Sequence, residues 1–528
     1  MSTATVPLSV STGSNSALDR SMPLHMALAL YSAITALILF ASLRAADHHF
    51  VYALDDPYIE MAMAKSLALH GTWGITRFGF TSSSSSPLFT LLLALLYRLT
   101  GVHEVTALFL SWIGGVVSIW LADRLLPGDM NRVLRTATLI AFILATPLFS
   151  IAVLGMEHSF HLALALIFLI EFQKSRRSSI RLFFISALMT GARYESLFLI
   201  VAAACLLMIQ RAWRPLCCMI GGAALAVGSY GAFALAHGSH FLPDSVALKG
   251  TTTRGGEFLV VAIVKFLRAP HLALLLLVLL MAAVALRRIQ PYWAQLSLLL
   301  FLAGTCHVIF ASIGAAFRYE AYFIALSCLV LGTAVSYLRD FGTVQKWSLV
   351  VALLVSGSVL AVRSSNALRA LPGYSRSIYL QQYQSARFLQ SFFPEASVAA
   401  NDIGAISFFT DIHCTDLVGL ADGKIFEAKR SGIFTTDFLR SEAAANRVQI
   451  AIVYEGWFTG PSGHFWIGPR LPREWTRVAV LKVPHSEMLG GDAVSFYAVD
   501  RSMIAPLRAS LYRFELTLPA ASSLTLQR

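Results

Sequence analysis

The chain has 528 residues, of which 56% are hydrophobic and only 13% are charged. Apolar runs of bilayer-spanning length recur along it, which excludes a soluble globular protein and predicts an α-helical polytopic membrane protein. The formal net charge is +12, but residues from Ser364 onward hold 16 of the 41 Lys and Arg and 14 of the 29 Asp and Glu. The positive excess therefore lies in short connections between apolar runs, as the positive-inside rule describes, and nucleic acid is excluded as a partner.

The N-terminal segment, residues 1–21, is polar and precedes an apolar run over residues 23–43. This run is longer than the apolar region of a usual signal peptide, so we interpret it as an uncleaved first span with a cytoplasmic N-terminus. A cleaved signal peptide is the alternative, because R-A-A-D after the run offers small residues.

Basic residues set the orientation of the later spans. They fall in five connections that should be cytoplasmic, at residues 124–135, 174–181, 211–214, 287–288 and 339–346. The polar hinges between paired apolar segments must then face outside. These hinges are G-M-E-H at Gly155, G-A-R-Y-E at Gly191, residues 237–270 and A-F-R-Y-E at Ala316.

One apolar segment does not fit this alternation. Residues 87–99 are too few to cross about 30 Å of hydrocarbon at about 1.5 Å per residue. We therefore expect this segment and residues 57–70 to lie in the outer interface as juxtamembrane helices. The transmembrane domain then covers residues 22–363 with about eleven spans, and its first outer loop is about 47–104.

The pattern changes beyond residue 363. Residues 376–393 have the pattern of an amphipathic helix, and five strand-like runs follow: S-V-A-A-N, C-T-D-L-V-G, V-Q-I-A-I-V-Y, R-V-A-V-L-K-V and V-S-F-Y-A-V-D. Residues 364–528 are therefore predicted to form a small α/β domain outside the membrane.

Three acidic residues are candidate catalytic groups on the outer face. Asp56 precedes Pro57 and suits the start of a helix, so we interpret it as a helix cap. Asp55 has no such role and is free to act as a base on a substrate hydroxyl. Glu157 is either an interface loop residue or a second carboxylate brought to the same site.

Three basic residues on the outer face are candidates for binding a phosphate. Arg193, Lys249 and Arg318 suit this role because Arg offers a bidentate fork and Lys a point charge. The alternative is that they pair with nearby acids. Those acids are Glu195, Glu257 and Glu320, respectively.

An ordered set of short motifs resembles the GT-C superfamily of integral-membrane glycosyltransferases that use polyprenyl-phosphate-linked sugars. Within it, the chain is most similar to the arabinofuranosyltransferase-like and lipopolysaccharide or protein glycosyltransferase branch. The motifs are L-D-D-P-Y-I, G-F-T-S, S-P-L-F-T-L-L-L-A-L-L, G-M-E-H, A-R-Y-E, L-P-D-S-V-A-L-K, F-R-Y, N-D-I-G-A-I and D-L-V-G-L-A-D. Two departures are the serine tract at residues 82–86 and Tyr194, where relatives often have Pro.

The resemblance implies a role for each candidate. Asp55 would be the catalytic base, Asp56 its supporting acid and Glu157 a member of the same site. Lys249 and Arg318 would bind the lipid phosphate, and Arg193 is carried over on a weaker match.

We therefore expect a transferase in the bacterial cytoplasmic membrane, with its site and C-terminal domain on the periplasmic or outer face. It would move a sugar, for example a pentose such as arabinofuranose, from a polyprenyl phosphate to an envelope glycan, lipid or protein, with inversion. The sequence leaves open whether the paired acids hold a divalent metal. A carrier or flippase for a lipid-linked sugar is the alternative, although the acids gather at helix ends and no repeated halves are visible.

Overall fold

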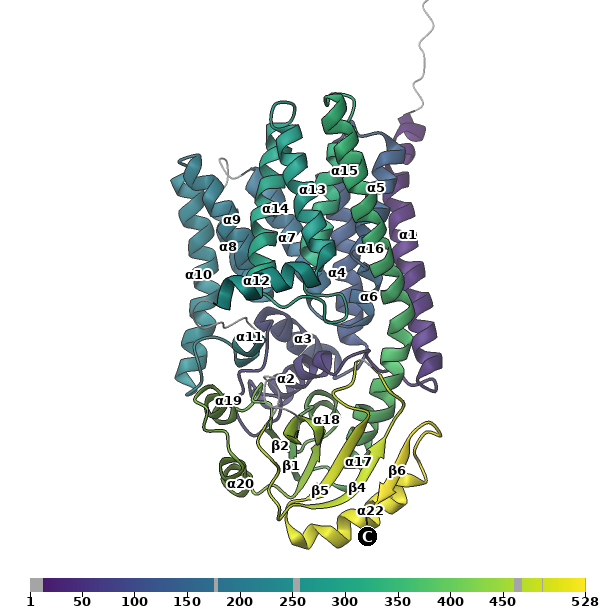
Figure 1. The fold of residues 1–528 in the computed structure, drawn as a ribbon, viewed down its shortest axis with the longest axis vertical. Coiled ribbons are helices and arrows are strands. Elements are labelled where there is room, and N and C mark those ends of the chain that lie inside the picture. Colours follow the sequence, from purple (N-terminus) through teal and green to yellow (C-terminus); the bar gives the residue numbers. More distant parts are fainter. Residues whose placement is uncertain (1–12, 175–178, 250–256, 460–467, 487, 528) are drawn as a thin grey trace, which may run out of the picture.

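The computed structural model consists of a helical bundle with an α/β domain at one end (Figure 1). It describes residues 13–174, 179–249, 257–459, 468–486 and 488–527. The long helices of the bundle are α1 (Gly13–Ala45), α4 (Thr106–Leu125), α5 (Arg132–Ala145), α7 (His158–Gln173), α8 (Ser179–Ala192), α9 (Ser196–Ile209), α10 (Trp213–Ala236), α13 (Pro270–Leu286), α14 (Pro291–Phe310), α15 (Ala321–Ser336) and α16 (Thr343–Ile378). We call the end of the bundle that carries the α/β domain the domain side.

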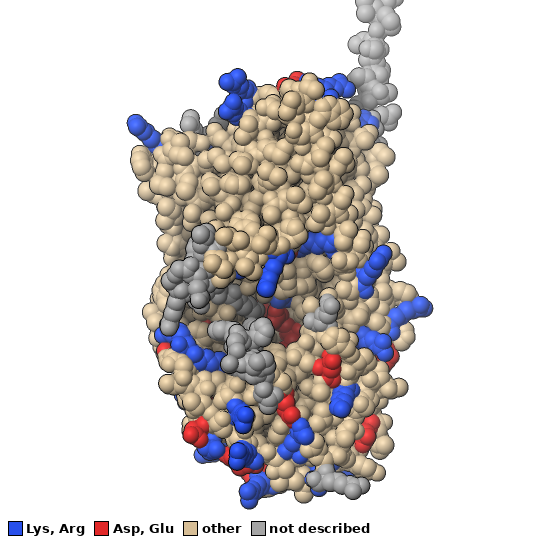
Figure 2. Space-filling model, viewed as in Figure 1, with Lys and Arg blue, Asp and Glu red and all other residues tan. Residues whose placement is uncertain are grey.

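Among the described residues, five helices are long and apolar enough to cross a membrane. A sixth span is added if α13 is counted together with α12 (Glu257–Arg268), which meets it at a bend of 95°. Other apolar helices of the bundle have 14 to 16 residues. The multi-pass architecture is confirmed, while the number of eleven spans stays a prediction. In Figure 2 a broad band of the bundle carries almost no charged side chains, and Lys and Arg gather at the end away from the α/β domain.

Short helices fill the space between the bundle and the α/β domain. They are α2 (Asp56–His70), α3 (Pro87–Thr100), α6 (Leu148–Val153), α11 (Asp244–Lys249) and α12. The pair α2 and α3 packs together beneath the bundle (Figure 1). Residues 87–99 thus lie outside the row of long helices, as predicted. Gly71 is the C-cap of α2. Its left-handed backbone, with φ of 69°, is a conformation that glycine adopts easily and that ends the helix.

The helix α16 continues without a break from the bundle into the α/β domain. The predicted boundary at residues 363–364 therefore lies inside this helix, and a π-helical turn at Tyr379–Tyr383 leads directly into α17 (Gln384–Phe392). A continuous helix transmits the position of the domain rigidly to the bundle.

The domain is built on a six-stranded mixed sheet in the order β2-β1-β3-β5-β4-β6. β1 pairs in parallel with β2 and β3, and the remaining neighbours are antiparallel. All five strand-like runs of the sequence correspond to β1–β5, and β6 is an additional strand. The strands are β1 (Ser397–Ala400), β2 (His413–Asp416), β3 (Ile450–Val453), β4 (Thr476–Lys482), β5 (Ala493–Ala498) and β6 (Ser523–Leu526).

Helices complete the domain on both faces of the sheet (Figure 1). They are α18 (Gly404–Phe409), α19 (Gly423–Arg430), α20 (Thr436–Ala445), α21 (Gly456–Thr459), a 3-10 turn (Arg501–Met503) and α22 (Ile504–Glu515). One apolar core runs from α2 and α3 into the sheet, so the domain and the juxtamembrane helices share buried side chains. Lys65 of α2 adds polar contacts, since its Nζ donates to the carbonyl oxygens of Phe408 at 2.9 Å and Thr410 at 3.1 Å.

Candidate active site

Arg193 is the centre of a buried ionic cluster on the domain side. It follows α8 in the A-R-Y-E turn and is 4% exposed. Its guanidinium pairs with Glu157 and with Glu195, and its Nη1 lies 2.9 Å from His158 Nε2. The alternative given for Arg193, pairing with Glu195, is confirmed. Burial alone would raise the pKa of Glu195, but the positive charge of Arg193 lowers it to about 2.

A second arginine lies nearby, in the loop before α15. Arg318 is 3% exposed, and its Nη2 pairs with Asp56 while its Nη1 contacts Met156 Sδ at 2.8 Å. The alternative pairing of Arg318 with Glu320 is wrong, because Glu320 pairs with Arg363 instead. The G-M-E-H motif thus serves both arginines, through Met156 for one and Glu157 for the other.

The ring of Tyr319 brings the two arginines together. The guanidinium carbon of Arg193 lies 5.5 Å from the ring centre, and that of Arg318 lies 5.0 Å from it. Contact with the ring face stabilises each cation. Glu157, Glu195 and Asp56 balance the charge of the two guanidiniums, which allows both to lie against one ring.

A cavity of about 250 Å³ opens beside these arginines. We call it the arginine cavity. Its lining includes apolar side chains, among them Leu197, Phe310 and Val246. Its polar lining includes Ser85, Arg193, Glu195, Arg318 and Tyr319.

A larger apolar groove of about 790 Å³ adjoins this cavity. It runs between α2, α3, α8 and α10 and is lined by side chains such as Leu88, Leu91, Leu188 and Phe233. Tyr194 lines both the groove and the arginine cavity. The groove and the arginine cavity therefore share Tyr194 as a common wall.

Glu60 is a buried acid of α2 that sequence reasoning did not single out. It is 4% exposed, and it accepts hydrogen bonds from Ser84 Oγ at 2.8 Å, from the Ser85 N–H at 3.1 Å and from Thr90 Oγ1. Burial, reinforced by the charge of Glu157, raises its pKa to about 7. The serine tract at residues 82–86 thus packs around the Glu60 carboxylate and contributes Ser85 to the arginine cavity. The sequence signal for this contact is an acid in one helix, Glu60, followed one loop later by a run of hydroxyl residues that can donate to it.

Backbone strain fixes the position of Arg318. The four residues 314–317 all have positive φ, which costs energy for the three that are not glycine. Glu320 holds this turn by accepting from the Gly314 N–H at 2.9 Å, and Arg363 Nη2 donates to the Phe317 carbonyl at 2.7 Å. The turn therefore depends on α16, on which Arg363 lies.

Asp55 and Asp56 turn to different partners. Asp55 is 9% exposed and accepts hydrogen bonds from the N–H groups of Gly404 at 2.6 Å and Ala405 at 2.8 Å, at the start of α18. Burial, and then the nearby charge of Asp402, raises its pKa well above the usual value. The interpretation of Asp56 as a helix cap is wrong, since Asp55 occupies the N-cap position of α2 and Asp56, the first helical residue, pairs with Arg318.

The remaining predicted residues are also accounted for. Lys249 is the last residue of α11, and its side chain lies outside the described residues, as does Glu257's. Within the described part of the chain, no group of three or more His, Cys, Asp or Glu side chains is placed to hold a metal ion. The structure therefore brings together Asp56, Glu157, Arg193 and Arg318, and it places Asp55 at the adjoining domain contact.

Comparisons with known proteins agree with this architecture. Residues 375–497 match a family model described as Domain of unknown function (DUF8728). None of the curated proteins matches the chain. Solved structures do match, and none of those compared below is more than 12% identical.

Crystal structures of ArnT from Cupriavidus metallidurans are 12% identical and cover 90% of this chain and 98% of theirs. The TM-score is 0.51 for ArnT bound to undecaprenyl phosphate and 0.53 for the apo state. An oligosaccharyltransferase from Archaeoglobus fulgidus, tethered to an acceptor peptide, is 12% identical over 94% of this chain and 75% of its own, with a TM-score of 0.47. The chain thus shares the fold of the ArnT structures over 90% of its length.

Proposed function

We propose that this protein is a glycosyltransferase that takes a sugar from a polyprenyl-phosphate donor. The observation that carries the proposal is the junction at Tyr194 between an apolar groove and a cavity lined by two buried arginines. A polyprenyl phosphate has this same division into a long apolar tail and a charged head. The ArnT structure that shares the fold was solved with undecaprenyl phosphate bound.

The two arginines would act on the leaving group. When the glycosidic bond to a lipid phosphate breaks, negative charge grows on the phosphate oxygen. Arg193 and Arg318 are held in place before the reaction by Glu157, Glu195 and Asp56, so they can stabilise that charge without reorganising. Lys249, at the end of α11, is proposed as a third phosphate-binding group on the family resemblance.

The geometry favours Asp56 as the base that takes the acceptor's proton. Its side chain is 29% exposed and lies against Arg318, whereas both oxygens of Asp55 are held by α18. A single displacement with this base would invert the anomeric centre of the sugar. Asp55, the base expected from the family resemblance, would then hold the α/β domain against α2.

The finer assignments follow from the family resemblance. We propose a pentose such as arabinofuranose as the sugar, and an envelope glycan, lipid or protein as the acceptor. The protein would lie in the bacterial cytoplasmic membrane with the domain side outside. A carrier for a lipid-linked sugar is the second candidate, because the apolar groove alone suits a lipid tail.

A transfer assay in lipid nanodiscs tests the proposal. Undecaprenyl phosphate carrying radiolabelled arabinofuranose or a hexose is mixed with extracts of envelope acceptors, and labelled product is measured. Asp56→Asn should abolish transfer at normal protein levels, while Asp129→Asn, an exposed control, should retain it. Full transfer by Asp56→Asn together with none by Asp55→Asn would return the base to Asp55. In sealed proteoliposomes, donor movement across the bilayer without product would support the carrier instead.

A further inference from the structure

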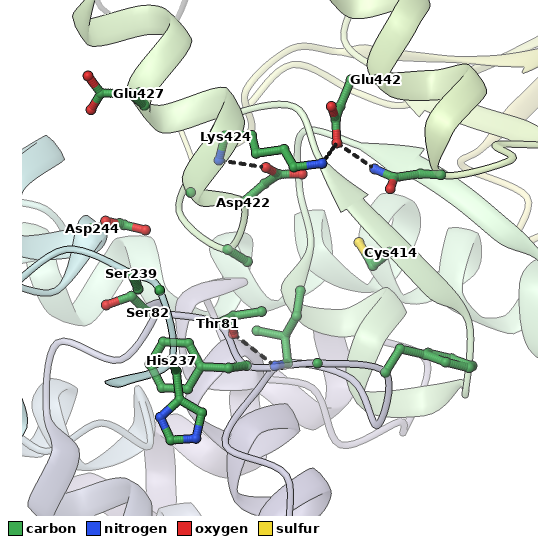
Figure 3. A pocket seen from close by; sticks show the side chains of 18 of the residues that line it. Thr81, Ser82, His237, Ser239, Asp244, Cys414, Asp422, Lys424, Glu427 and Glu442 are labelled. Carbon is green, nitrogen blue, oxygen red and sulfur yellow. Dashed lines mark hydrogen bonds and ion pairs between the residues drawn. The ribbon is translucent and has the colours of Figure 1, made fainter. Parts of the chain in front are cut away.

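A polar cleft of about 660 Å³ separates the bundle from the α/β domain (Figure 3). We call it the interdomain cleft. Its bundle wall consists of the loop around residues 75–82 and the end of α10 with the following loop, residues 237–244. Its domain wall consists of residues from β2, α19 and α20. Its volume is in the range of clefts that bind small molecules or parts of larger ones.

Asp244 is the strongest sign that this cleft binds a ligand. The residue is 1% exposed, and its Oδ1 is 2.8 Å from His240 Nδ1. Its Oδ2 is buried and has no hydrogen-bond partner among the described residues. A Cβ added to Gly423 would lie 4.0 Å from that oxygen, so the carboxylate lies close to the start of α19, where both residues line the cleft. A buried acceptor of this kind is normally satisfied, which indicates that a donor completes it.

Other polar groups of the cleft offer both donors and acceptors. Lys424 Nζ lies 3.3 Å from Glu442, which also accepts from Asn446 Nδ2 at 3.2 Å. His240 Nε2 lies 3.3 Å from Glu427 of the opposite wall. The four carboxylates in the lining outnumber its single lysine, which disfavours a phosphate or other anion. A neutral ligand rich in hydroxyl groups matches this mixture, because each hydroxyl both donates and accepts.

Aromatic rings line the same cleft. Phe78 is 47% exposed, and its ring packs edge-on to His413 of β2 at 5.2 Å. Phe80 stacks on His237 of the bundle wall with ring centres 4.8 Å apart. An exposed ring beside hydrogen-bonding groups suits a sugar, whose C–H face packs on an aromatic surface while its hydroxyls meet the polar groups. The cleft thus combines both contacts that carbohydrates need.

The cleft also lies next to the arginine cavity. Ser82 lines the cleft and Ser85 lines the arginine cavity, and three residues of extended chain span about 10 Å. The other shared wall passes from Asp244 in the cleft to Ser245 and Val246 in the cavity. A chain of sugars in the cleft could therefore present one hydroxyl to the arginine cavity.

We infer that the interdomain cleft binds the acceptor, and that the acceptor is a carbohydrate, through Phe78 and the free oxygen of Asp244. That the bound carbohydrate is an acceptor rests on the proposed transfer activity. Binding of a carbohydrate to the cleft can be measured without transfer. A peptide acceptor is the competing class, because β2 is an edge strand of the sheet.

Binding to the full-length protein in nanodiscs tests the inference. The probes are neutral oligosaccharides of two to six sugars released from bacterial envelope polysaccharide, and a mixture of synthetic peptides of matched length. Saturation-transfer NMR measures affinity, and amide hydrogen exchange locates the site. We expect oligosaccharides to bind and to protect amides of residues 75–82 and 420–428. No oligosaccharide binding, protection elsewhere, or displacement of the oligosaccharide by the peptides would overturn the inference.

Two variants with matched controls sharpen this test. Phe78→Ala and Asp244→Asn should each weaken oligosaccharide binding roughly tenfold, the size expected for losing one strong polar or stacking contact. Tyr512→Ala, at a 62% exposed ring of α22, and Asp340→Asn, between α15 and α16, should bind as the wild type does. Equal weakening by the controls would overturn the assignment. If a variant fails to fold, the exchange pattern of the wild-type protein still decides.

The two hypotheses fail in different ways. Carbohydrate binding at the cleft with no sugar transfer from any lipid donor would reject the proposed function alone. Transfer that proceeds with an unchanged acceptor KM in Phe78→Ala and Asp244→Asn would reject the cleft alone.

Discussion

Asp56 and Arg318 form a partly buried ion pair that joins the start of α2 to the loop before α15, across 262 positions of the chain. The pair fixes the juxtamembrane helix against the bundle beside the arginine cavity. It therefore links the position of the proposed base to that of a proposed phosphate-binding group.

Breaking this pair should separate its structural role from its catalytic role. Arg318→Gln leaves Asp56 without its partner, so both thermal stability and transfer should fall, the latter by roughly 10²–10³-fold. The double variant Asp56→Asn/Arg318→Gln removes both charges and should recover most of the lost Tm without recovering transfer. Melting curves and initial rates on the same preparations check this. Recovery of transfer in the double variant would contradict a catalytic role for the pair.

Arg193→Lys tests the second arginine with its charge retained. A lysine ammonium cannot reach Glu157, Glu195 and a phosphate in the fixed geometry of a guanidinium fork. We expect the KM for the lipid-phosphate donor to rise about tenfold, with a smaller change in the acceptor KM. Arg181→Lys is the matched control, because Arg181 is 66% exposed and pairs with Glu171 at 3.8 Å. An unchanged donor KM would remove Arg193 from the phosphate site.

Much of the fold could be predicted from local patterns. Hydropathy and the distribution of Arg and Lys indicate the bundle, and five strand-like runs match β1–β5. These features repeat within a few residues, so a short window of sequence contains them. The order of the motifs predicted one site that contains Asp56, Glu157, Arg193 and Arg318. The prediction succeeded because all four residues lie at helix ends on one side of the bundle.

The partners of those residues could not be predicted in the same way. Asp55 bonds to Gly404 across 349 positions, and Lys65 to Phe408 across 343. No periodicity specifies such contacts, because they depend on how α16 positions the α/β domain. The local rule for helix caps therefore assigned Asp56 to the start of α2 and left Asp55 for the substrate. In the structure Asp56 pairs with Arg318, and Asp55 contacts α18. The burial of Glu60 could not be predicted for the same reason, because its hydrogen-bond partners lie in the serine tract, outside its own helix.

Glu60 should make thermal stability depend on pH. Its pKa is raised from 4.5 to about 7 in the folded protein, so the folded state holds a proton that the unfolded state releases. The stabilising contribution is therefore complete below about pH 4.5 and is lost as pH rises through about 7. Melting curves from pH 5 to 8 should show a falling Tm, and Glu60→Gln should flatten this trend. An equal slope in both proteins would assign the dependence to other groups.

Arg363 should control the site from outside it. Its Nη2 lies 2.7 Å from both Glu320 Oε1 and the Phe317 carbonyl, so it holds the strained turn that precedes Arg318. Arg363→Lys keeps a charge for Glu320 but cannot match both contacts, and we expect kcat to fall about tenfold with little loss of Tm.

Arg363→Ala should do more, because Glu320 is 1% exposed and would lose its arginine partner, keeping the Gly314 N–H and His271 Nε2 at 3.5 Å. We expect a loss of about 3 kcal/mol in the free energy of unfolding. Arg369→Ala, at an exposed position of the same helix, should leave both kcat and Tm unchanged. If Arg363→Lys kept the wild-type kcat, the turn would hold Arg318 in place without α16, and the left-handed backbone of residues 314–317 alone would set its position.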